Sequence, residues 1–586
     1  MKISAEKEKK LSPLFLIILL GIGLYAMILN APFCFDDNAK IVSNSALKDT
    51  ATFEQIWKIP YAKTNFLTFV TFALNYRWGG MNPFGFHLVN IVLHLLSVFL
   101  SYRLVLIFFS CPAFSLSPLS AWKKSFALIA ALIFLCHPLQ TQSVTYVWAR
   151  SEILSAIFCF LSLLFYMNGR LKNRKPLLFL SFFLFLIGIF ARGNMIIFPL
   201  LVFLIEITFF RSTPLKITRL SSKGWLFLLG LGLSAILVGV FFSQLVNFFN
   251  ISYLFKNSYM PRTHYLLTQF SVIVQYIKLC IIPLGQNLDY DFPFSNSLFE
   301  FRTFGSLMIL LSILVSAVLC FKKHRLISFG IFWFFICLLP VSSIIPLSTV
   351  ISESRVYLPL FGFSVLVTAF MFSFIAEKKK VVRIAFVVIM GLSALTIARN
   401  SVWRSSIAIM EDTVRKSPLS GRAQANLGVA YSMAGLYDKA LDSYRTAFEL
   451  GSKRGMDRKY LAQILINLSS IYGLKGDYER EIHYCQQAIT YNSKNPQAYS
   501  NLGHAYALTG DYAKAITYGR KAVEISPTFV EGLTNLGVVY GRMGKYREAA
   551  EQFERALKLD RENEKAKQNL LLAQQLLKNS NEPAPF

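Results

Sequence analysis

Two adjacent carboxylates, Asp36 and Asp37, follow directly after the first long apolar run of the chain. Ionisable side chains at the edge of a bilayer are costly, and they are therefore functional candidates. Like charge and partial burial raise the pKa of a carboxyl group, so such a pair can supply a general base. The alternative is a structural role, in which the pair caps an interfacial helix or anchors a loop.

Polar side chains also recur at the start of the second apolar run. His87, Asn90 and His94 share one face at helical spacing. They could hydrogen-bond to a sugar or a pyrophosphate, although histidines at a helix entrance also serve structurally. No zinc site is expected, because no third ligand is apparent. The eight cysteines are dispersed without a Cys-x-x-Cys pair, so the sequence predicts neither a metal site nor a disulfide framework.

Two arginines, Arg150 and Arg355, stand at the start of later apolar runs. A guanidinium group can donate two charge-assisted hydrogen bonds to a phosphate, so both residues are candidates for binding a lipid-linked phosphate. His137 opens the loop that leads to Arg150. The alternative is that each arginine pairs with a neighbouring acid, Arg150 with Glu152 and Arg355 with Glu353.

The elements that must position these residues are membrane helices. Hydrophobic residues make up 54% of the 586 residues and charged residues only 16%, which is unusual for a soluble protein. The apolar runs end near Ala398, so residues 1–398 are predicted to form a polytopic membrane domain of an all-α protein. Runs of this length cross a bilayer as helices, and there are eleven: residues 13–31, 86–109, 125–137, 151–168, 177–192, 194–210, 225–246, 303–321, 326–340, 357–376 and 381–398.

The net charge of +28 is explained by short basic connections between these runs, so no nucleic acid partner is expected. With the N-terminus inside, eleven crossings place every basic cluster in the cytoplasm, as the positive-inside rule requires. The same count exports the candidate residues and the C-terminal third. The amphipathic stretch from Tyr265 to Ile282 is predicted to lie in the interface. The basic clusters are Lys7 to Lys10, Lys123-Lys124, Arg170 to Lys175, Arg211 to Lys223, Lys322 to Arg325 and Lys378 to Arg383.

The C-terminal third repeats. The motif Asn-Leu-Gly begins at Asn426, Asn501 and Asn535, with a weaker copy at Asn467. The last two spacings are 34 residues, which is the period of the tetratricopeptide helix pair. An α-solenoid is therefore predicted over residues 421–578, including a capping helix from Glu564. Residues 399–420 form the predicted linker or half-repeat, residues 579–586 a disordered tail, and Gly451 to Lys459 a longer loop.

Taken together, the motifs resemble those of the transmembrane and tetratricopeptide-containing O-mannosyltransferases and their bacterial homologues. The resemblance covers almost the whole chain in order. It is carried by Phe35-Asp36-Asp37, the series Asn75, Gly80, Asn82-Pro83, His87, Asn90 and His94, His137 to Thr141, Asn287 to Asp291, and Glu353, Arg355 and Tyr357-Leu358-Pro359.

That family resembles the C-type glycosyltransferases, which transfer sugars from polyprenyl-phosphate carriers outside the cytoplasm without a cofactor. The resemblance implies that Asp36 or Asp37 deprotonates a Ser or Thr hydroxyl, with inversion at the sugar and no metal. Two departures stand out: Asn65-Phe66 replaces the usual Arg-Pro, and Arg192-Gly193 the usual Lys-Glu. The residues expected to bind the donor are His87, Asn90, His137, Arg150, Arg192, Glu353 and Arg355.

The expected partners are the bilayer, a polyprenyl-phosphate sugar and a protein acceptor recruited by the repeats. A bacterial inner membrane with periplasmic repeats is the preferred location, with the endoplasmic reticulum as the alternative. The alternative function is a membrane-anchored scaffold whose catalytic half has degenerated, which the two departures favour. Transport is disfavoured, because the polar groups gather at one face and no inverted repeat is evident.

Overall fold

A computed structural model describes residues 12–44, 47, 53–59, 62–211, 260–343, 346–347 and 349–579. The predicted all-α fold class is confirmed, since the described residues form helices and none lies in a strand. Contacts within the chain define two compact units, Met1–Ile409 and Met410–Phe586.

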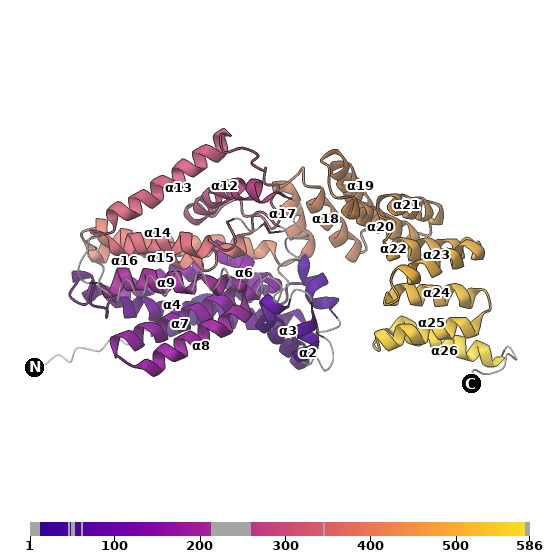
Figure 1. Cartoon of the computed structure of the whole chain (residues 1–586), viewed down its shortest axis with the longest axis horizontal. Helices are drawn as coiled ribbons and strands as arrows, with labels where there is room; N and C mark the ends of the chain where they lie inside the picture. Colours follow the sequence, from indigo (N-terminus) through magenta and orange to yellow (C-terminus); the bar gives the residue numbers. More distant parts are fainter. Residues whose placement is uncertain are drawn as a thin grey trace, which may run out of the picture. The chain divides into compact units, whose positions relative to one another are not determined.

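The first unit is a bundle of apolar helices (Figure 1). Seven stretches are long and apolar enough to cross a membrane: Pro83–Phe108 (α4), Pro118–Cys136 (η5 and α5), Val147–Leu171 (η7 and α7), Gly193–Phe210 (η8, α9 and η9), Phe301–Cys320 (α13), Glu353–Phe374 (η10 and α15) and Lys378–Val402 (α16). Three shorter apolar stretches are Pro13–Ile28 (α1 and η1), Lys175–Ala191 (α8) and Arg325–Leu338 (α14). These ten overlap every predicted span except 225–246, which lies outside the described residues. The protein is an integral membrane protein.

Close helix contacts hold the bundle together. Leucine, phenylalanine and other apolar side chains from α1, α4, α5, α7, α9, α14 and α15 form one buried cluster. Between α14 and α15 the backbones themselves meet, because a Cβ atom at Gly330 would lie 2.5 Å from the Gly362 carbonyl oxygen. Small residues allow such approaches between membrane helices. The membrane helices therefore form a rigid frame for the loops at their ends.

The helices alternate in direction, so their connecting loops gather at two opposite ends. At one end, called the Asp37 end, His87 contacts the Ala31 carbonyl and Thr145 donates to the Asn400 side chain. At the other, called the Lys123 end, the Ala113 amide donates to the Phe209 carbonyl. The chain leaves the first unit at the Asp37 end, where α16 finishes.

The helix Arg262–Ile281 (α12) is not among the apolar helices long enough to cross. Near its start, the Tyr265 hydroxyl donates to the Val341 carbonyl. At its other end, the Cys280 carbonyl accepts from His137. Both contacts are at the Asp37 end, and that α12 lies in the membrane interface stays a prediction. The shorter helices Phe53–Lys58 (α2) and Phe66–Gly79 (α3) belong to the same end.

The second unit is a stack of antiparallel helix pairs (Figure 1). Gly503 is the glycine of the repeat motif that begins at Asn501. A Cβ atom at this position would lie 3.0 Å from the Ala515 carbonyl oxygen, which explains the small residue there. The helices are Ser406–Lys416 (α17), Gly421–Met433 (α18), Tyr437–Lys453 (α19), Arg458–Leu474 (α20), Tyr478–Tyr491 (α21), Pro496–Leu508 (α22), Tyr512–Ile525 (α23), Val530–Arg542 (α24), Tyr546–Leu559 (α25) and Glu564–Asn579 (α26).

One loop prediction for this unit is wrong. The extra residues between the first two repeats lengthen the helices α19 and α20, so most of the predicted loop from Gly451 to Lys459 is helical. Gly451 packs in the last turn of α19, where a Cβ atom would lie 2.9 Å from the Leu461 side chain. This packing favours the longer helices.

Candidate functional site

The paired aspartates lie on a sharply turned segment at the Asp37 end. Phe35 adopts a φ of 54°, in the left-handed region that residues with a side chain rarely occupy. A small apolar core, which includes Phe69, Phe72 and Val147, underlies this segment. The turn and the core together fix the direction in which the two carboxylates leave the first membrane helix.

Asp37 is buried and joins this segment to the start of α7. Its Oδ1 accepts from the Trp148 amide at 2.7 Å, and its Oδ2 accepts from the Cys34 amide at 3.3 Å. Burial raises the pKa of Asp37 to about 8, a shift to which the nearby Asp36 adds and which the backbone amides oppose. Asp36 is half-buried. Asp37 thus carries the structural contacts, and Asp36 is the more accessible carboxylate.

Arg150 is a buried connector of three helices. Its Nε donates to Asn90 Oδ1 and its Nη1 to Asn75 Oδ1, both at 2.6 Å. Its Nη2 donates to the Phe86 carbonyl at 3.0 Å, and its guanidinium lies 4.6 Å from the centre of the Phe72 ring. In the structure the Arg150 guanidinium therefore donates to other groups of the protein. Arg150 does not form the alternative ion pair with Glu152.

The histidines of the predicted site also contact other groups of the protein. His87 is buried and contacts the Ala31 carbonyl at 3.0 Å, while His94 contacts the Tyr357 hydroxyl at 2.8 Å. His137 Nε2 donates to the Cys280 carbonyl, its Nδ1 accepts from the Leu139 amide, and burial lowers its pKa to about 4. These contacts position helices and loops at the Asp37 end, as the structural alternative expects.

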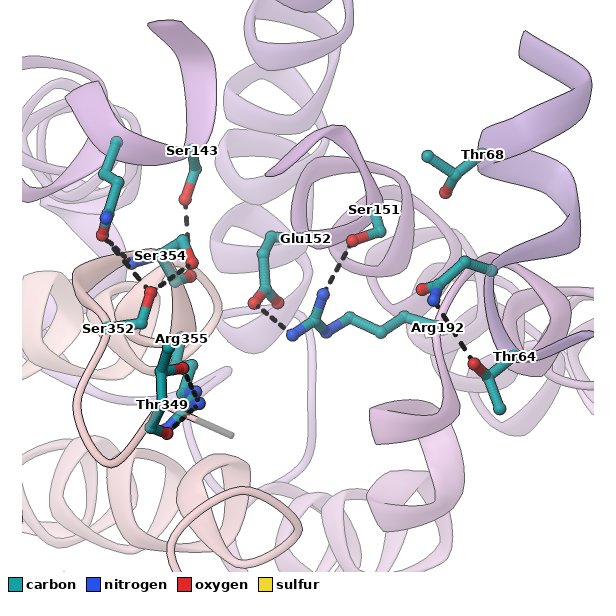
Figure 2. A network of polar contacts seen from close by, with 12 residues as sticks. Thr64, Thr68, Ser143, Ser151, Glu152, Arg192, Thr349, Ser352, Ser354 and Arg355 are labelled. Atoms are coloured by element: carbon teal, nitrogen blue, oxygen red, sulfur yellow. Dashed lines mark hydrogen bonds and ion pairs between the residues drawn. The ribbon is translucent and has the colours of Figure 1, made fainter. Parts of the chain in front are cut away.

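A second group of charges consists of Glu152, Arg192 and Arg355 (Figure 2). Arg192 Nη2 forms an ion pair with Glu152 Oε1 at 2.8 Å, and its Nη1 donates to the Ser151 hydroxyl at 2.7 Å. Burial lowers the pKa of Arg192, nearby Arg355 adds to that effect, and Glu152 opposes it. Two guanidinium groups therefore act on one carboxylate, which leaves this group with an excess of positive charge.

Arg355 and Glu353 hold the loops that surround this group. Arg355 Nη2 donates to the Thr349 carbonyl at 2.6 Å and to its hydroxyl at 2.8 Å (Figure 2). Glu353 Oε1 accepts from the Asn287 amide at 2.6 Å and from the Tyr290 hydroxyl. The expected pairing of Arg355 with Glu353 is therefore wrong in the structure, because each residue binds a different loop.

The chain links Asp37 to the second group of charges through η7 and the first turn of α7. Trp148, whose amide binds Asp37, is followed four residues later by Glu152, which binds Arg192. The partners of Arg150 could not be predicted from the sequence, because Asn75 and Asn90 are remote from it along the chain. Glu353's partners Asn287 and Tyr290 lie within a motif that was recognised without a role.

The arrangement provides an accessible carboxylate near an excess of guanidinium charge. A carboxylate can accept a proton from a hydroxyl, and guanidinium groups bind phosphate oxygens. One buried donor, Arg192 Nε, has no hydrogen-bond partner among the described residues. The Asp37 end therefore holds the two kinds of group that a sugar transfer from a phosphate requires.

Comparison with known proteins finds similarity for the repeats and over most of the chain. A family model described as tetratricopeptide repeat matches residues 419–494 and 494–562. The Caenorhabditis elegans protein O-mannosyl-transferase F38B6.6 is 23% identical over 463 residues, with 75% of this chain and 62% of the relative covered. Human protein O-mannosyl-transferase TMTC4 is 24% identical over 464 residues, with 70% and 62% covered. The chain is a relative of the transmembrane and tetratricopeptide-repeat O-mannosyltransferases.

The match to these O-mannosyltransferases is partial in length, since the chain spans 62% of the two relatives. A shorter match has a higher identity: Xenopus laevis protein O-mannosyl-transferase tmtc2 is 33% identical over 160 residues, which is 25% of this chain and 18% of the relative. Among solved structures, a MamA crystal structure shares 23% identity, covers 31% of this chain and 87% of its own, and has a TM-score of 0.23.

The two departures from the O-mannosyltransferase pattern lie near the Arg192 group. Asn65 ends the short helix Lys63–Asn65, and its Nδ2 donates to the Thr64 hydroxyl (Figure 2). Thr68, one turn further, donates to the Ala191 carbonyl next to Arg192. Gly193 follows Arg192 directly. At these two positions the resemblance implies Arg-Pro and Lys-Glu. Of the charged groups in that pattern, this chain keeps only the positive charge, at Arg192.

Proposed function

We propose that the chain is a membrane glycosyltransferase. It transfers a hexose, with mannose as the proposed sugar, from a polyprenyl-phosphate carrier to Ser or Thr of exported proteins. The observation that carries the proposal is the link from Asp37 through Trp148 to the Glu152 and Arg192 pair. This link places the candidate base and the candidate phosphate ligands at one end of the bundle. The names of the relatives supply the sugar and the acceptor class.

In the proposed reaction Asp36 takes the proton of the acceptor hydroxyl. The hydroxyl oxygen bonds to the anomeric carbon from the side opposite the carrier, and the bond from that carbon to the phosphate oxygen breaks. The electron pair of the broken bond stays on the phosphate, where Arg192 and the positive charge of Arg355 stabilise it. The configuration at the sugar is inverted, and the proposal assigns no role to a metal or a cofactor.

The other predicted residues support this site without touching the substrate. Asp37 holds the aspartate segment against α7, and Arg150 and Asn90 join α7 to α4. His87, His137 and Glu353 fix the neighbouring loops. We propose that the repeat unit recruits the acceptor, because stacked helix pairs form extended binding surfaces. The reaction end and the repeats would face the periplasm, or the lumen of the endoplasmic reticulum.

The proposal is tested by mass spectrometry of exported proteins from cells with and without the gene. The expected result is a hexose on Ser or Thr of some proteins that is lost on deletion and restored by a plasmid copy. An unchanged pattern of modification would contradict the proposal.

A second candidate, the scaffold with a degenerate catalytic half, is favoured by Asn65-Phe66, which stands where the resemblance implies Arg-Pro. If the chain is a scaffold, a plasmid copy with Asp36→Asn should restore every phenotype of the deletion as well as the wild-type copy does. A transferase would not, because the variant lacks the base.

A further inference from the structure

An open cavity lies at the Lys123 end of the bundle, opposite the site described above. Its volume is about 430 Å³, and it is formed where α1 and α5 begin and α4 approaches its end. This volume is within the range of small-ligand sites. Three cations line it: Arg103 on α4, and Lys123 and Lys124 at the start of α5.

These cations differ from other basic residues at the same end. Arg170 is paired with Glu206 at 2.8 Å, and Lys378 donates to the Phe372 carbonyl at 2.6 Å. For Arg103, Lys123 and Lys124, the part of the chain that the structure describes provides no ion pair. None of the residues that line the cavity is acidic. Among the described residues, the cavity lining therefore carries three positive charges and no carboxylate.

The remaining walls define what kind of anion fits. Leu14, Phe99, Leu106 and Ile107 line the cavity together with the cations. Leu14 is 43% exposed, on a helix apolar enough to lie in the bilayer. The Tyr102 and Ser110 side chains add hydroxyl groups at the cavity wall. A ligand that matches all of these features has a phosphate at one end and a hydrocarbon chain at the other.

We propose that this cavity binds the phosphate of an anionic membrane lipid, with an acyl chain along Leu14, Phe99 and Ile107. Loops rich in Lys and Arg face the cytoplasm, whose leaflet contains anionic lipids. Each Lys or Arg near such a surface contributes substantially to the attraction. A lipid bound here would join α4 and α5 to α1, the helix that leads to Asp36.

The test uses the full-length protein in detergent and measures lipid binding by native mass spectrometry during titration with phosphatidylglycerol. The double variant Lys123→Gln/Lys124→Gln should bind phosphatidylglycerol at least about tenfold more weakly. The matched control is Lys322→Gln/Lys323→Gln, which removes two exposed lysines from the same end outside the cavity. It should bind as the wild type does.

Two further arms separate the sources of the phosphate. Phosphatidylcholine should bind much more weakly than phosphatidylglycerol, because its headgroup has no net charge. Inorganic phosphate at millimolar concentration should leave lipid binding unchanged, because it lacks the acyl chain. Equal affinity of the cavity variant and the control, equal binding of the two lipids, or displacement by inorganic phosphate would each overturn the proposal. A melting temperature close to that of the wild type shows that the variant is folded.

Discussion

The two aspartates differ in burial, and this difference assigns them different tasks. Asp37 accepts hydrogen bonds from two backbone amides and is 1% exposed, whereas Asp36 is half-buried. With its pKa raised to about 8, Asp37 is mostly neutral at pH 7. A neutral Asp37 spares Asp36 the repulsion of a second charge, which keeps Asp36 available as the base.

Replacement of Asp37 by Asn therefore imitates its neutral form. We expect Asp37→Asn to retain turnover at pH 7 to within about tenfold, since one of the two amide contacts is kept. In the wild type, kcat/KM should change as pH rises through about 8, where Asp37 becomes charged. Asp37→Asn should lack that inflection. A variant whose profile still bends at the same pH would show that another group titrates there.

Arg150 is buried and Arg192 is half-buried, and the structure predicts different phenotypes for their replacement. Arg192→Gln should raise the KM for the polyprenyl-phosphate donor about tenfold or more, because the phosphate loses a charge-assisted donor. The donor KM of Arg192→Lys should lie between those of the wild type and Arg192→Gln, because lysine keeps the charge but not the planar guanidinium. Arg150→Gln is the matched control and should lower the melting temperature, since the Oδ1 atoms of the buried Asn75 and Asn90 lose the guanidinium that donates to them. A normal donor KM in Arg192→Gln would remove Arg192 from the site.

At the scale of helices, the pair α20 and α21 contains a buried acid in the second unit. Glu481 is 4% exposed, and its Oε2 has no hydrogen-bond partner among the described residues. It packs against Gly473, where a Cβ atom would lie 2.6 Å from that oxygen. Burial raises the pKa of Glu481 to about 8. The folded state thus favours the protonated acid.

The sign of the pH effect follows from this shift. A folded pKa above the unfolded value gives stability that is complete below about pH 4.5 and is lost as pH rises through about 8. Glu481→Gln should therefore stabilise the repeat unit at pH 8, by about 1–3 kcal/mol, and change little at pH 4.5. Hydrogen exchange of the amides in α20 and α21, measured in the full-length protein at both pH values, tests it. Equal effects at the two pH values would contradict the account.

Elements with a local signature could be predicted from the sequence, and long-range partners could not. The apolar spans are visible in hydropathy, and the repeat helices follow from the 34-residue spacing between Asn501 and Asn535. Arg150 contacts Asn75 on α3 and Asn90 on α4, which are 75 and 60 residues away in the sequence. Nearby acids were therefore the obvious partners, and the structure shows that they are not used.

For the whole molecule, the order of the two units along the chain suggests a division of labour. The membrane unit ends at the Asp37 end, and the repeat unit follows directly. Deletion of residues 421–586 should abolish modification of a folded acceptor while sparing transfer to a short peptide at high concentration. The two acceptors are compared with the same purified, truncated enzyme. Equal loss with both would show that the repeats serve the membrane unit itself.

The central claim is that the Asp37 end transfers a sugar from a lipid-linked phosphate with Asp36 as the base. The most direct measurement uses purified full-length protein, polyprenyl-phosphate mannose and a Ser/Thr peptide, with mass spectrometry of the product. The wild type should form mannosyl peptide, and the nearly isosteric Asp36→Asn should be slower by about 10²–10⁴-fold at an unchanged melting temperature. Transfer by Asp36→Asn at the wild-type rate would contradict the claim.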